Sequence, residues 1–321
     1  MKFMRERGPA GPRRLRELLA APGIIMGGGA HDGLSARIVE QCDYPLCVVT
    51  GAGTSMCRGY PDIGLVSGEE MVANARYIAE AIEIPVIVDA DNGYGNAINV
   101  IRAVREYIQC GVAAIHIEDQ VVPKRCGHVA GRQVIGIEEA VGKFRAADAV
   151  RKEYDPDFVL IARTDARGAV GGSLDEAIRR ANAYLEAGAD LAFVEGPTSV
   201  EEVRRVCREV HGQVFYNLAG VSPRFGQAEM EELGIKVAIA PGATFRATMT
   251  AVYDLALAMR EKGSIAEHEF DQKFKQHPLA DYHTFAGFDR IRAWEAEFMP
   301  ADEQAKYQGT VGHMPGGERQ T

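Results

Sequence analysis

The alternation of short apolar runs with longer segments of helical periodicity constrains the fold of this chain more than any other feature. Eight apolar runs are predicted as strands, at 24–26, 47–50, 85–89, 114–118, 159–163, 191–195, 214–217 and 236–240. Helices are predicted between them over 68–82, 97–110, 137–152, 174–187 and 200–210. Strands that are apolar throughout are buried on both faces, so the pattern predicts a closed parallel (β/α)8 (TIM) barrel. A doubly wound sheet is the alternative, but no GxGxxG motif follows the first strand.

The 321 residues divide into three predicted parts. Residues 1–262 form the barrel, 263–299 form a C-terminal helical extension, and 300–321, rich in glycine, proline and charge, are expected to be a flexible tail. At the other end, the basic stretch from Met1 to Arg16 lacks the apolar core of a secretory signal. Residues 15–19, followed by Pro22 and Gly23, predict a short amphipathic helix that ends in a turn.

Composition narrows the class of function. The net charge of −9 argues against a nucleic-acid surface, which needs clustered Lys and Arg. No stretch approaches the roughly 18–20 unbroken apolar residues of a membrane span. The six cysteines are scattered without a CxxC pair, which predicts reduced thiols and a cytoplasmic protein. Small anionic substrates stay open, because they need only a local positive site.

Polar side chains stand at the ends of five successive predicted strands, where a barrel builds its active site. They are Asp89 and Asp91, then His116, Glu118 and Asp119, then Arg163 and Asp165, then Glu195, and then Asn217. One polar residue at a strand end means little, since burial stops there. Five successive ends with carboxylates, an arginine and an asparagine predict a polar pocket.

Three of these carboxylates are predicted to hold a metal. Alternation along a strand places Asp89 and Asp91 on the same side, where Glu118 can join them. Oxygen ligands without His or Cys favour Mg²⁺, with Mn²⁺ as the alternative. Helix capping and loop hydrogen bonds are the competing explanation, which accounts for one Asp more easily than for three carboxylates. We expect Asp119 and Asp165 to be structural.

The loop after the fourth strand carries Lys124–Arg125–Cys126–Gly127–His128. Two cations and a histidine beside a cysteine predict a lowered thiol pKa, and the glycines nearby suit a movable lid. A solvated basic loop with an incidental cysteine is the alternative. After the second strand, residues 51–55 could offer backbone N–H groups to a carboxylate, although a tight turn explains them almost as well. His31, His116 and His211 are interpreted as packing or surface residues.

These motifs resemble the isocitrate lyase/phosphoenolpyruvate mutase superfamily over about Leu15 to Phe298. The resemblance rests on 61–62, 88–95, 117–120, 124–128 and 162–165. Lys-Arg-Cys-Gly-His on a gating loop is a signature of the lyase branch, which includes 2-methylisocitrate and 2,3-dimethylmalate lyases. Phosphonate-processing relatives lack the cysteine motif, so the resemblance speaks against a mutase or a phosphonopyruvate hydrolase.

The resemblance implies a role for each matching residue. The metal ligands would be Asp89, Asp91 and Glu118, supported by Asp62; Thr50, Gly51 and Ala52 would bind the 2-oxo acid portion; and Arg163 would pair with a carboxylate. Cys126 would protonate the carbanion left by a retro-aldol-type cleavage, assisted by Lys124 and His128. Glu195 and Asn217 would contact the substrate or order the closed loop. A homotetramer that exchanges C-terminal helices is also implied.

The resemblance leaves the substrate open. The run from Asn217 to Ser222 lacks the glutamate that methylisocitrate lyases carry there, and Val48 stands near a position where they carry a tyrosine. Residues 131–134 and 194–197 are more similar to the 2,3-dimethylmalate lyase subgroup, which favours a 2-alkylmalate over 2-methylisocitrate. Two other hypotheses remain: oxaloacetate decarboxylation or hydrolysis on the same barrel, and a catalytically silent binding protein.

Overall fold

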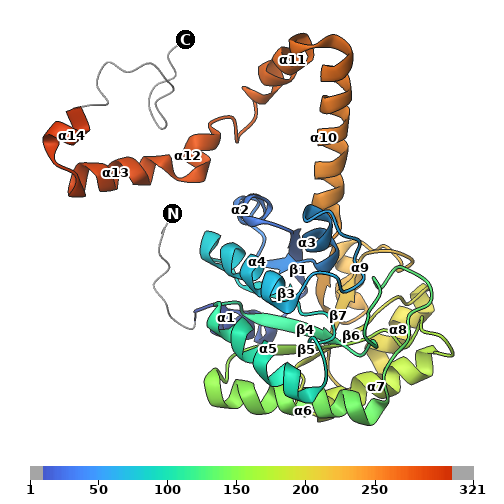
Figure 1. Cartoon of the computed structure of the whole chain (residues 1–321). Helices are drawn as coiled ribbons and strands as arrows, with labels where there is room; N and C mark the ends of the chain where they lie inside the picture. The colour runs from blue at the N-terminus through green and yellow to red at the C-terminus, as the bar shows by residue number, and fades with distance from the viewer. Residues whose placement is uncertain (1–9, 306–321) are drawn as a thin grey trace. The chain divides into compact units, whose positions relative to one another are not determined.

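Every strand pairs in parallel with its two neighbours in the sequence, and β1 pairs with β8, so the sheet closes into an eight-stranded barrel. This computed structural model describes residues 10–305. The strands are β1 (Ile25–Ala30), β2 (Leu46–Val49), β3 (Val86–Asp89), β4 (Ala114–Glu118), β5 (Val159–Thr164), β6 (Leu191–Val194), β7 (Gln213–Asn217) and β8 (Ile235–Ile239). They lie inside a ring of helices (Figure 1). The predicted TIM barrel is confirmed.

The five helices predicted between residues 68 and 210 are present with closely matching bounds, and these and three further helices surround the barrel. They are α2 (Gly33–Gln41), α3 (Gly51–Cys57), α4 (Gly68–Ala81), α5 (Ala97–Gln109), α6 (Ile137–Tyr154), α7 (Leu174–Glu186), α8 (Val200–Glu209) and α9 (Gln227–Glu232). Six of them begin at a side chain that accepts a backbone N–H of the first turn: Asp32, Thr50, Ser67, Asn96, Ser173 and Ser199. Such caps satisfy backbone donors that the helix leaves without a partner.

The first strand is longer than its apolar run predicts. It continues through Gly27, Gly28 and Gly29 to Ala30. These positions are glycines because neighbouring parts of the chain come too close to leave room for a side chain. A Cβ on Gly28 would lie 2.4 Å from Val39 Cγ1, and a Cβ on Gly29 would lie 2.6 Å from the carbonyl oxygen of Pro241. Hydrophobic periodicity cannot show a strand that is built from residues without side chains.

The inward faces of the strands change from apolar to polar along the barrel axis. Their N-terminal halves form one buried cluster that includes Leu46, Ile87, Ile161 and Phe215. Helix α1 (Ala10–Ala20) closes this end, since its Leu15 is fully buried in the same cluster. Alternate residues of a strand face the same side. Polar residues that stand two positions after the apolar residues of this cluster therefore point inward at the C-terminal end of the barrel.

The chain divides into two compact units, one of residues 4–247 and the other made mainly of 248–321. The second unit contains most of α10 (Ala243–Lys262), followed by α11 (Ser264–Phe274), α12 (Tyr282–Ala286), α13 (Phe288–Phe298) and α14 (Ala301–Ala305). The predicted boundary at residue 262 is the end of α10, whereas the two units divide the chain between residues 247 and 248, inside that helix. Of the expected tail, 301–305 are helical and 306–321 lie outside the described residues.

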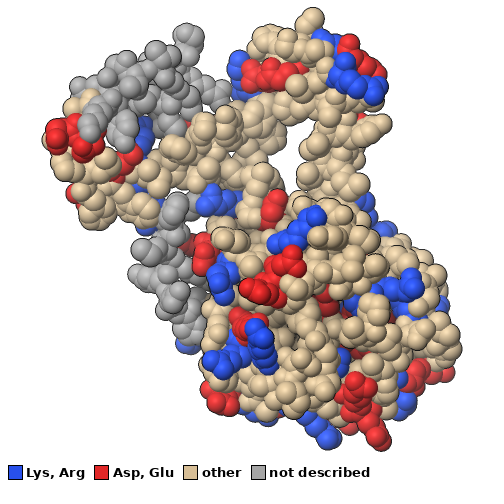
Figure 2. Space-filling view, in the orientation of Figure 1, with Lys and Arg blue, Asp and Glu red and all other residues tan. Residues whose placement is uncertain are grey.

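Charged side chains of both signs lie among one another on the face of the barrel in Figure 2. Several charged side chains of the protein are paired along helices, such as Arg102 with Glu106 and Lys152 with Asp148. Between residues 10 and 305, no helix is long and apolar enough to cross a membrane.

The close packing of β1 against the segment after β8 predicts the effect of a Gly29→Ala substitution. The added methyl group would meet the backbone of Pro241, which cannot rotate away, so we expect a loss of about 1–3 kcal/mol of stability. Urea unfolding followed by circular dichroism measures it. Gly142→Ala in α6 is the control, because a Cβ there meets nothing within 4 Å and alanine favours a helix. Equal unfolding midpoints for both variants would contradict this packing argument.

Candidate active site

A cavity of about 220 Å³ opens at the C-terminal ends of the strands. It is lined by nine residues that the sequence analysis selected: Thr50, Ala52, Asp62, Asp89, Cys126, His128, Arg163, Glu195 and Asn217. The other selected residues, Gly51, Asp91, Glu118 and Lys124, contact these lining residues without forming the wall. The selected residues therefore gather in one place, although they lie on different strands and loops.

The period of two along the strands decides which carboxylates face this cavity. On β4, Glu118 points toward Arg163 on the inner side, whereas Asp119 points outward. Asp119 accepts hydrogen bonds from the Thr164 hydroxyl, the Tyr184 hydroxyl and the N–H of Asp165. Asp119 thus joins β4 to β5 and α7, and it has the structural role that was expected of it.

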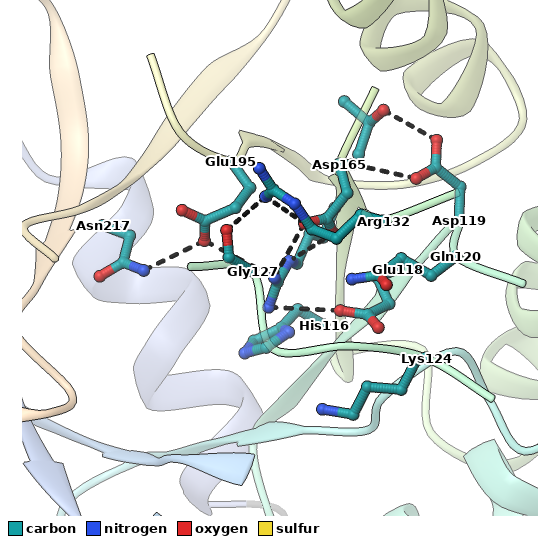
Figure 3. A network of polar contacts seen from close by, with 12 residues as sticks. His116, Glu118, Asp119, Gln120, Lys124, Gly127, Arg132, Asp165, Glu195 and Asn217 are labelled. Carbon is teal, nitrogen blue, oxygen red and sulfur yellow. Dashed lines mark hydrogen bonds and ion pairs between the residues drawn. The ribbon is translucent and has the colours of Figure 1, made fainter. Parts of the chain in front are cut away.

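Arg163 lies within reach of three carboxylates, those of Glu118, Asp165 and Glu195, which are labelled in Figure 3. Its guanidinium donates two hydrogen bonds to Asp165, at 3.0 and 3.2 Å. It also lies 3.3 Å from a Glu118 oxygen and 3.7 Å from a Glu195 oxygen. Asn217 donates to Glu195 at 3.1 Å. Arg163 therefore balances buried negative charge from three strand ends.

The predicted pairing of Asp89 and Asp91 through strand alternation is not what brings them together. Strand β3 ends at Asp89, and Asp91 has a φ of +48°, so the alternation stops before it. The N–H of Asp91 instead donates to Asp89 Oδ1 at 3.0 Å. The ammonium of Lys124 bridges Asp62 and Asp91, lying 2.6 Å from Asp91 Oδ1.

Burial acts to raise the pKa of the Asp89, Asp91 and Glu118 carboxyl groups, but nearby cations overcome this effect in one of them only. It would raise the pKa of Asp89, but His116, Lys124 and Arg163 lower that pKa to about 2. Burial raises the pKa of Asp91 to about 6 although Lys124 opposes it, and burial also raises that of Glu118 well above its usual range. A site with these buried carboxylates is short of positive charge. Among the described residues, however, no three His, Cys, Asp or Glu side chains form a ready-made metal cage.

The loop that carries Cys126 lies closed over the cavity. The N–H of Cys126 donates to the carbonyl oxygen of Asp62 at 3.0 Å, and Cys126 forms part of the cavity wall. Gly127 explains how the loop can come so close: a Cβ there would lie 2.3 Å from an Arg163 nitrogen and 2.9 Å from Glu195 Cγ. A side chain at this position would hold the loop away from the site.

The expected lowering of the Cys126 thiol pKa is wrong. Burial and the nearby Asp62 carboxylate raise this pKa to about 11. The flanking cations do not act as the sequence suggested, because Lys124 turns to Asp62 and Asp91 and Arg125 is exposed. A protonated thiol at neutral pH is suited to donating a proton rather than to attacking as a thiolate.

Two groups of cavity residues were missed. His116 was interpreted as a packing residue, yet it lines the cavity, with its Nδ1 3.5 Å from Asp89 Oδ1; burial lowers its pKa to about 4. Its position two residues before Glu118 on the same strand could have revealed it. The other group, Pro241, Gly242, Phe245 and Arg246, follows β8, and no polar strand end drew attention to it.

The glycine-rich run after β2 forms helix α3 rather than a tight turn. Thr50 is its N-cap and accepts the N–H of Gly53 at 3.4 Å. The N–H of Gly51 points to Asp89 Oδ2 at 3.3 Å. The backbone donors of this helix terminus therefore face the carboxylate at the floor of the site, as well as the cavity that Thr50 and Ala52 line.

Comparisons with known proteins agree with this arrangement. The family model for phosphoenolpyruvate phosphomutase matches residues 15–260. The chain belongs to the phosphoenolpyruvate mutase/isocitrate lyase superfamily. It is therefore an enzyme, and a catalytically silent barrel is not supported.

Its relatives include lyases and a hydrolase. The chain is 43% identical to 2,3-dimethylmalate lyase of Eubacterium barkeri, over 79% of this chain and 87% of that protein. It is 33% identical to 2-methylisocitrate lyase of Bacillus subtilis strain 168, over 87% and 92%. A crystal structure of oxaloacetate acetylhydrolase with 3,3-difluorooxalacetate superposes with a TM-score of 0.83 and 32% identity, over 91% of this chain and 99% of that chain.

The raised pKa of Cys126 predicts slow alkylation. At pH 8 the thiol will react with iodoacetamide on the order of 10²-fold more slowly than a thiol of ordinary pKa near 8.5, because so little thiolate is present. Its rate will keep rising with pH toward 11. Peptide mass spectrometry follows the reaction, with the exposed Cys42 as an internal control. Equal rates for the two thiols at pH 8 would show that Cys126 is not protected.

Proposed function

We propose that this enzyme is a Mg²⁺-dependent carbon–carbon lyase that cleaves a 2-hydroxy di- or tricarboxylate into a 2-oxo acid and a carboxylic acid. The observation that carries the proposal is a protonated thiol held over a cavity with a surplus of carboxylates. Six carboxylates, of Asp62, Asp89, Asp91, Glu118, Asp165 and Glu195, stand in or beside the cavity against four cations, of Lys124, Arg132, Arg163 and Arg246. An acidic site of this kind binds an anionic substrate only with an added cation.

The side chains present fit a hard divalent cation. Both oxygens of Glu118 are buried and accept no hydrogen bond from the described residues, although Oε2 lies 3.3 Å from the Arg163 guanidinium. Asp91 Oδ1 is buried too and is paired with the Lys124 ammonium. All the candidate ligands are carboxylates, which suits Mg²⁺, with Mn²⁺ as the alternative. Asp89, which lines the cavity, would hold the cation, with Asp91 and Glu118 acting directly or through water. When bound, the cation would supply Lewis-acid polarisation of the 2-oxo acid oxygens.

The protein's own groups would carry the remaining steps. The backbone donors near Thr50, Gly51 and Ala52 would bind the 2-oxo acid portion, and Arg163 would face a carboxylate. Loss of the proton from the substrate hydroxyl forms a carbonyl group as the carbon–carbon bond breaks, and the bonding electron pair passes to the departing carboxylate as an enediolate. Cys126 would give its thiol proton to that carbon. The proton lost from the hydroxyl would pass to solvent, and a proton from solvent would restore the thiol after product release. A closed loop keeps water from quenching the carbanion first.

Neighbours of Cys126 would support this proton transfer. Lys124 fixes the loop to Asp62 and Asp91. His128 Nδ1 lies 3.8 Å from Glu195 Oε1, an oxygen that accepts no hydrogen bond from the described residues. Glu195 and Asn217 would contact the substrate or order the loop, as the sequence analysis expected.

A 2-alkylmalate of the 2,3-dimethylmalate type is the substrate that we favour. The cavity wall is largely apolar, with Val48, Met56, Phe193, Ala219, Ile239 and Phe245 beside the charged groups. Such a wall suits alkyl substituents better than the third carboxylate of 2-methylisocitrate. The 43% sequence identity to 2,3-dimethylmalate lyase of Eubacterium barkeri supports the same choice.

Oxaloacetate hydrolysis is the second candidate. It is favoured by the likeness to oxaloacetate acetylhydrolase, whose structure covers nearly the same length of chain. Oxaloacetate decarboxylation, which makes a related enolate, is tested by the same experiment.

A time course by NMR tests the reaction. With Mg²⁺ and a panel of 2,3-dimethylmalate, 2-methylisocitrate, isocitrate, citramalate and oxaloacetate, we expect one hydroxy acid to yield a 2-oxo acid and a second acid. EDTA will stop the reaction and added Mg²⁺ will restore it. Consumption of oxaloacetate alone would replace the lyase with the hydrolase or decarboxylase.

The proton-donor role predicts the effect of Cys126→Ser. The hydroxyl group is a far weaker acid than the thiol, so kcat should fall roughly 10²–10⁴-fold while substrate still binds. Steady-state kinetics with the substrate found by NMR measures this. The matched control is Cys42→Ser, at an exposed thiol that follows α2. Full activity in Cys126→Ser would remove the assignment.

We also propose a cytoplasmic homotetramer that exchanges its C-terminal helices. All six cysteines are unpaired, which supports the location. Helices α10, α12 and α13 bury no residue, and Met249, Val252 and Tyr253 of α10 are 59%, 61% and 67% exposed. So much exposed apolar surface needs cover from another chain.

Light scattering after size exclusion should therefore give four times the 34.9 kDa of one chain. Val252→Asp will lower the mass, because it places a charge in the covered face. Val170→Asp is the control, at a valine that is 71% exposed on the barrel. A monomer for the unaltered chain would refute the assembly.

A further inference from the structure

The loop over the cavity leaves and rejoins the barrel through a narrow neck. Gln120 and Val134 form an isolated antiparallel bridge. Beside it, the N–H of Val121 donates to the backbone carbonyl oxygen of Gln133 at 3.0 Å, and the N–H of Ile135 donates to that of Asp119 at 2.9 Å. These backbone bonds close the base of the loop, but they lie several residues from Cys126 and cannot by themselves fix its thiol.

The side chain of Gln120 holds the loop on the N-terminal side of Cys126. Its Oε1 accepts the N–H of Arg125 at 2.9 Å, and its Nε2 donates to the carbonyl oxygen of Arg125 at 2.8 Å. The Gln120 side chain is 1% exposed, and both bonds are partly buried. An amide group can satisfy a backbone donor and a backbone acceptor at once, which neither a carboxylate nor an apolar side chain can do.

The side chain of Arg132 holds the loop on the other side of Cys126. Its guanidinium donates to the carbonyl oxygen of Gly127 and, at 3.0 Å, to Asp165 Oδ1. Figure 3 shows Arg132 between these two partners, with Asp165 turned toward the centre of the network. Because Asp165 also binds Arg163, the loop is tied directly to the charged floor of the cavity.

Three consecutive residues of the loop are thus each fixed by a different element. Gln120 holds Arg125, the carbonyl oxygen of Asp62 holds the N–H of Cys126, and Arg132 holds Gly127. We propose that Gln120 and Arg132 are positioning residues that latch the loop closed and hold the Cys126 thiol in the cavity. The inference rests on the proposed function only for the proton-donor role of Cys126.

The latch predicts that Gln120→Leu will release the loop. The backbone of Arg125 would lose two partly buried hydrogen bonds, so closure is weakened. We expect Cys126 to be alkylated at pH 8 roughly tenfold or more faster, because the opened thiol meets solvent and reagent. With the substrate found by NMR, kcat should fall on the order of 10²-fold and KM much less, since a misplaced donor impairs the transition state.

Gln133→Leu is the matched control. It lies on the same neck, its side chain is exposed, and that side chain makes no hydrogen bond to the described residues, while its backbone carbonyl stays in place. We expect wild-type alkylation and kcat from it. If Gln120→Leu matches Gln133→Leu in both measurements, Gln120 is not part of a latch.

Arg132 provides an independent test. Arg132→Met should also speed alkylation of Cys126, and Arg132→Lys should restore part of the protection because its ammonium can still reach a carbonyl oxygen. Arg125→Met is the control, at an exposed arginine of the same loop. Melting temperatures of all variants identify any that unfold.

The outcomes separate this inference from the proposed function. Faster alkylation of Cys126 in both latch variants supports the latch even when no compound of the panel is turned over. A loss of kcat with unchanged alkylation, or a loss of protection that appears only with a lower melting temperature, overturns it.

Discussion

The buried guanidinium of Arg163 is the interaction on which the rest of the site depends. Burial alone would lower its pKa, but Asp165, Glu118 and Glu195 raise it well above its usual range. The same positive charge compensates these three carboxylates, which are each no more than 1% exposed. Removing one member of such a group leaves an uncompensated buried charge, which typically costs about 3–5 kcal/mol. The ends of strands β4, β5 and β6 are joined at this one side chain.

One guanidinium does not neutralise all the acid groups around it. Lys124 reaches in from the loop to Asp62 and Asp91, and Arg132 reaches Asp165, so two further cations arrive with the closed loop. Glu118 is left with oxygens that accept no hydrogen bond. In its closed position the loop therefore supplies part of the positive charge that balances the site, and the proposed divalent cation would complete this balance for an anionic substrate.

Much of the fold followed from periodicity. Eight apolar runs marked the eight strands to within a few residues, because strands buried on both faces must be apolar along their length. The exception was β1, where Gly27, Gly28 and Gly29 continue the strand without side chains that a pattern could register. Nine of the selected site residues line a single cavity, since a parallel barrel brings all its C-terminal strand ends to one rim.

Other features depended on contacts between distant segments. Strand alternation did not place Asp91, because its backbone turns left-handed after β3. His116 was interpreted as a packing residue because it lies inside an apolar strand, although its place two residues before Glu118 puts it on the cavity side. The segment after β8 that completes the wall carries no motif. Nor could spacing show that Gln120 and Arg132 grip the residues on either side of Cys126.

The sequence by itself determined the barrel, the rim on which the site lies and the residue types that meet there. The tertiary structure decided their electrostatic state. Two flanking cations suggested a lowered thiol pKa at Cys126, whereas burial and Asp62 raise that pKa. The Lys124 ammonium pairs with the carboxylates of Asp62 and Asp91 instead. The reason is physical: strand order and periodicity are local properties of the chain, but a pKa depends on solvent exposure and on charges that only folding brings near.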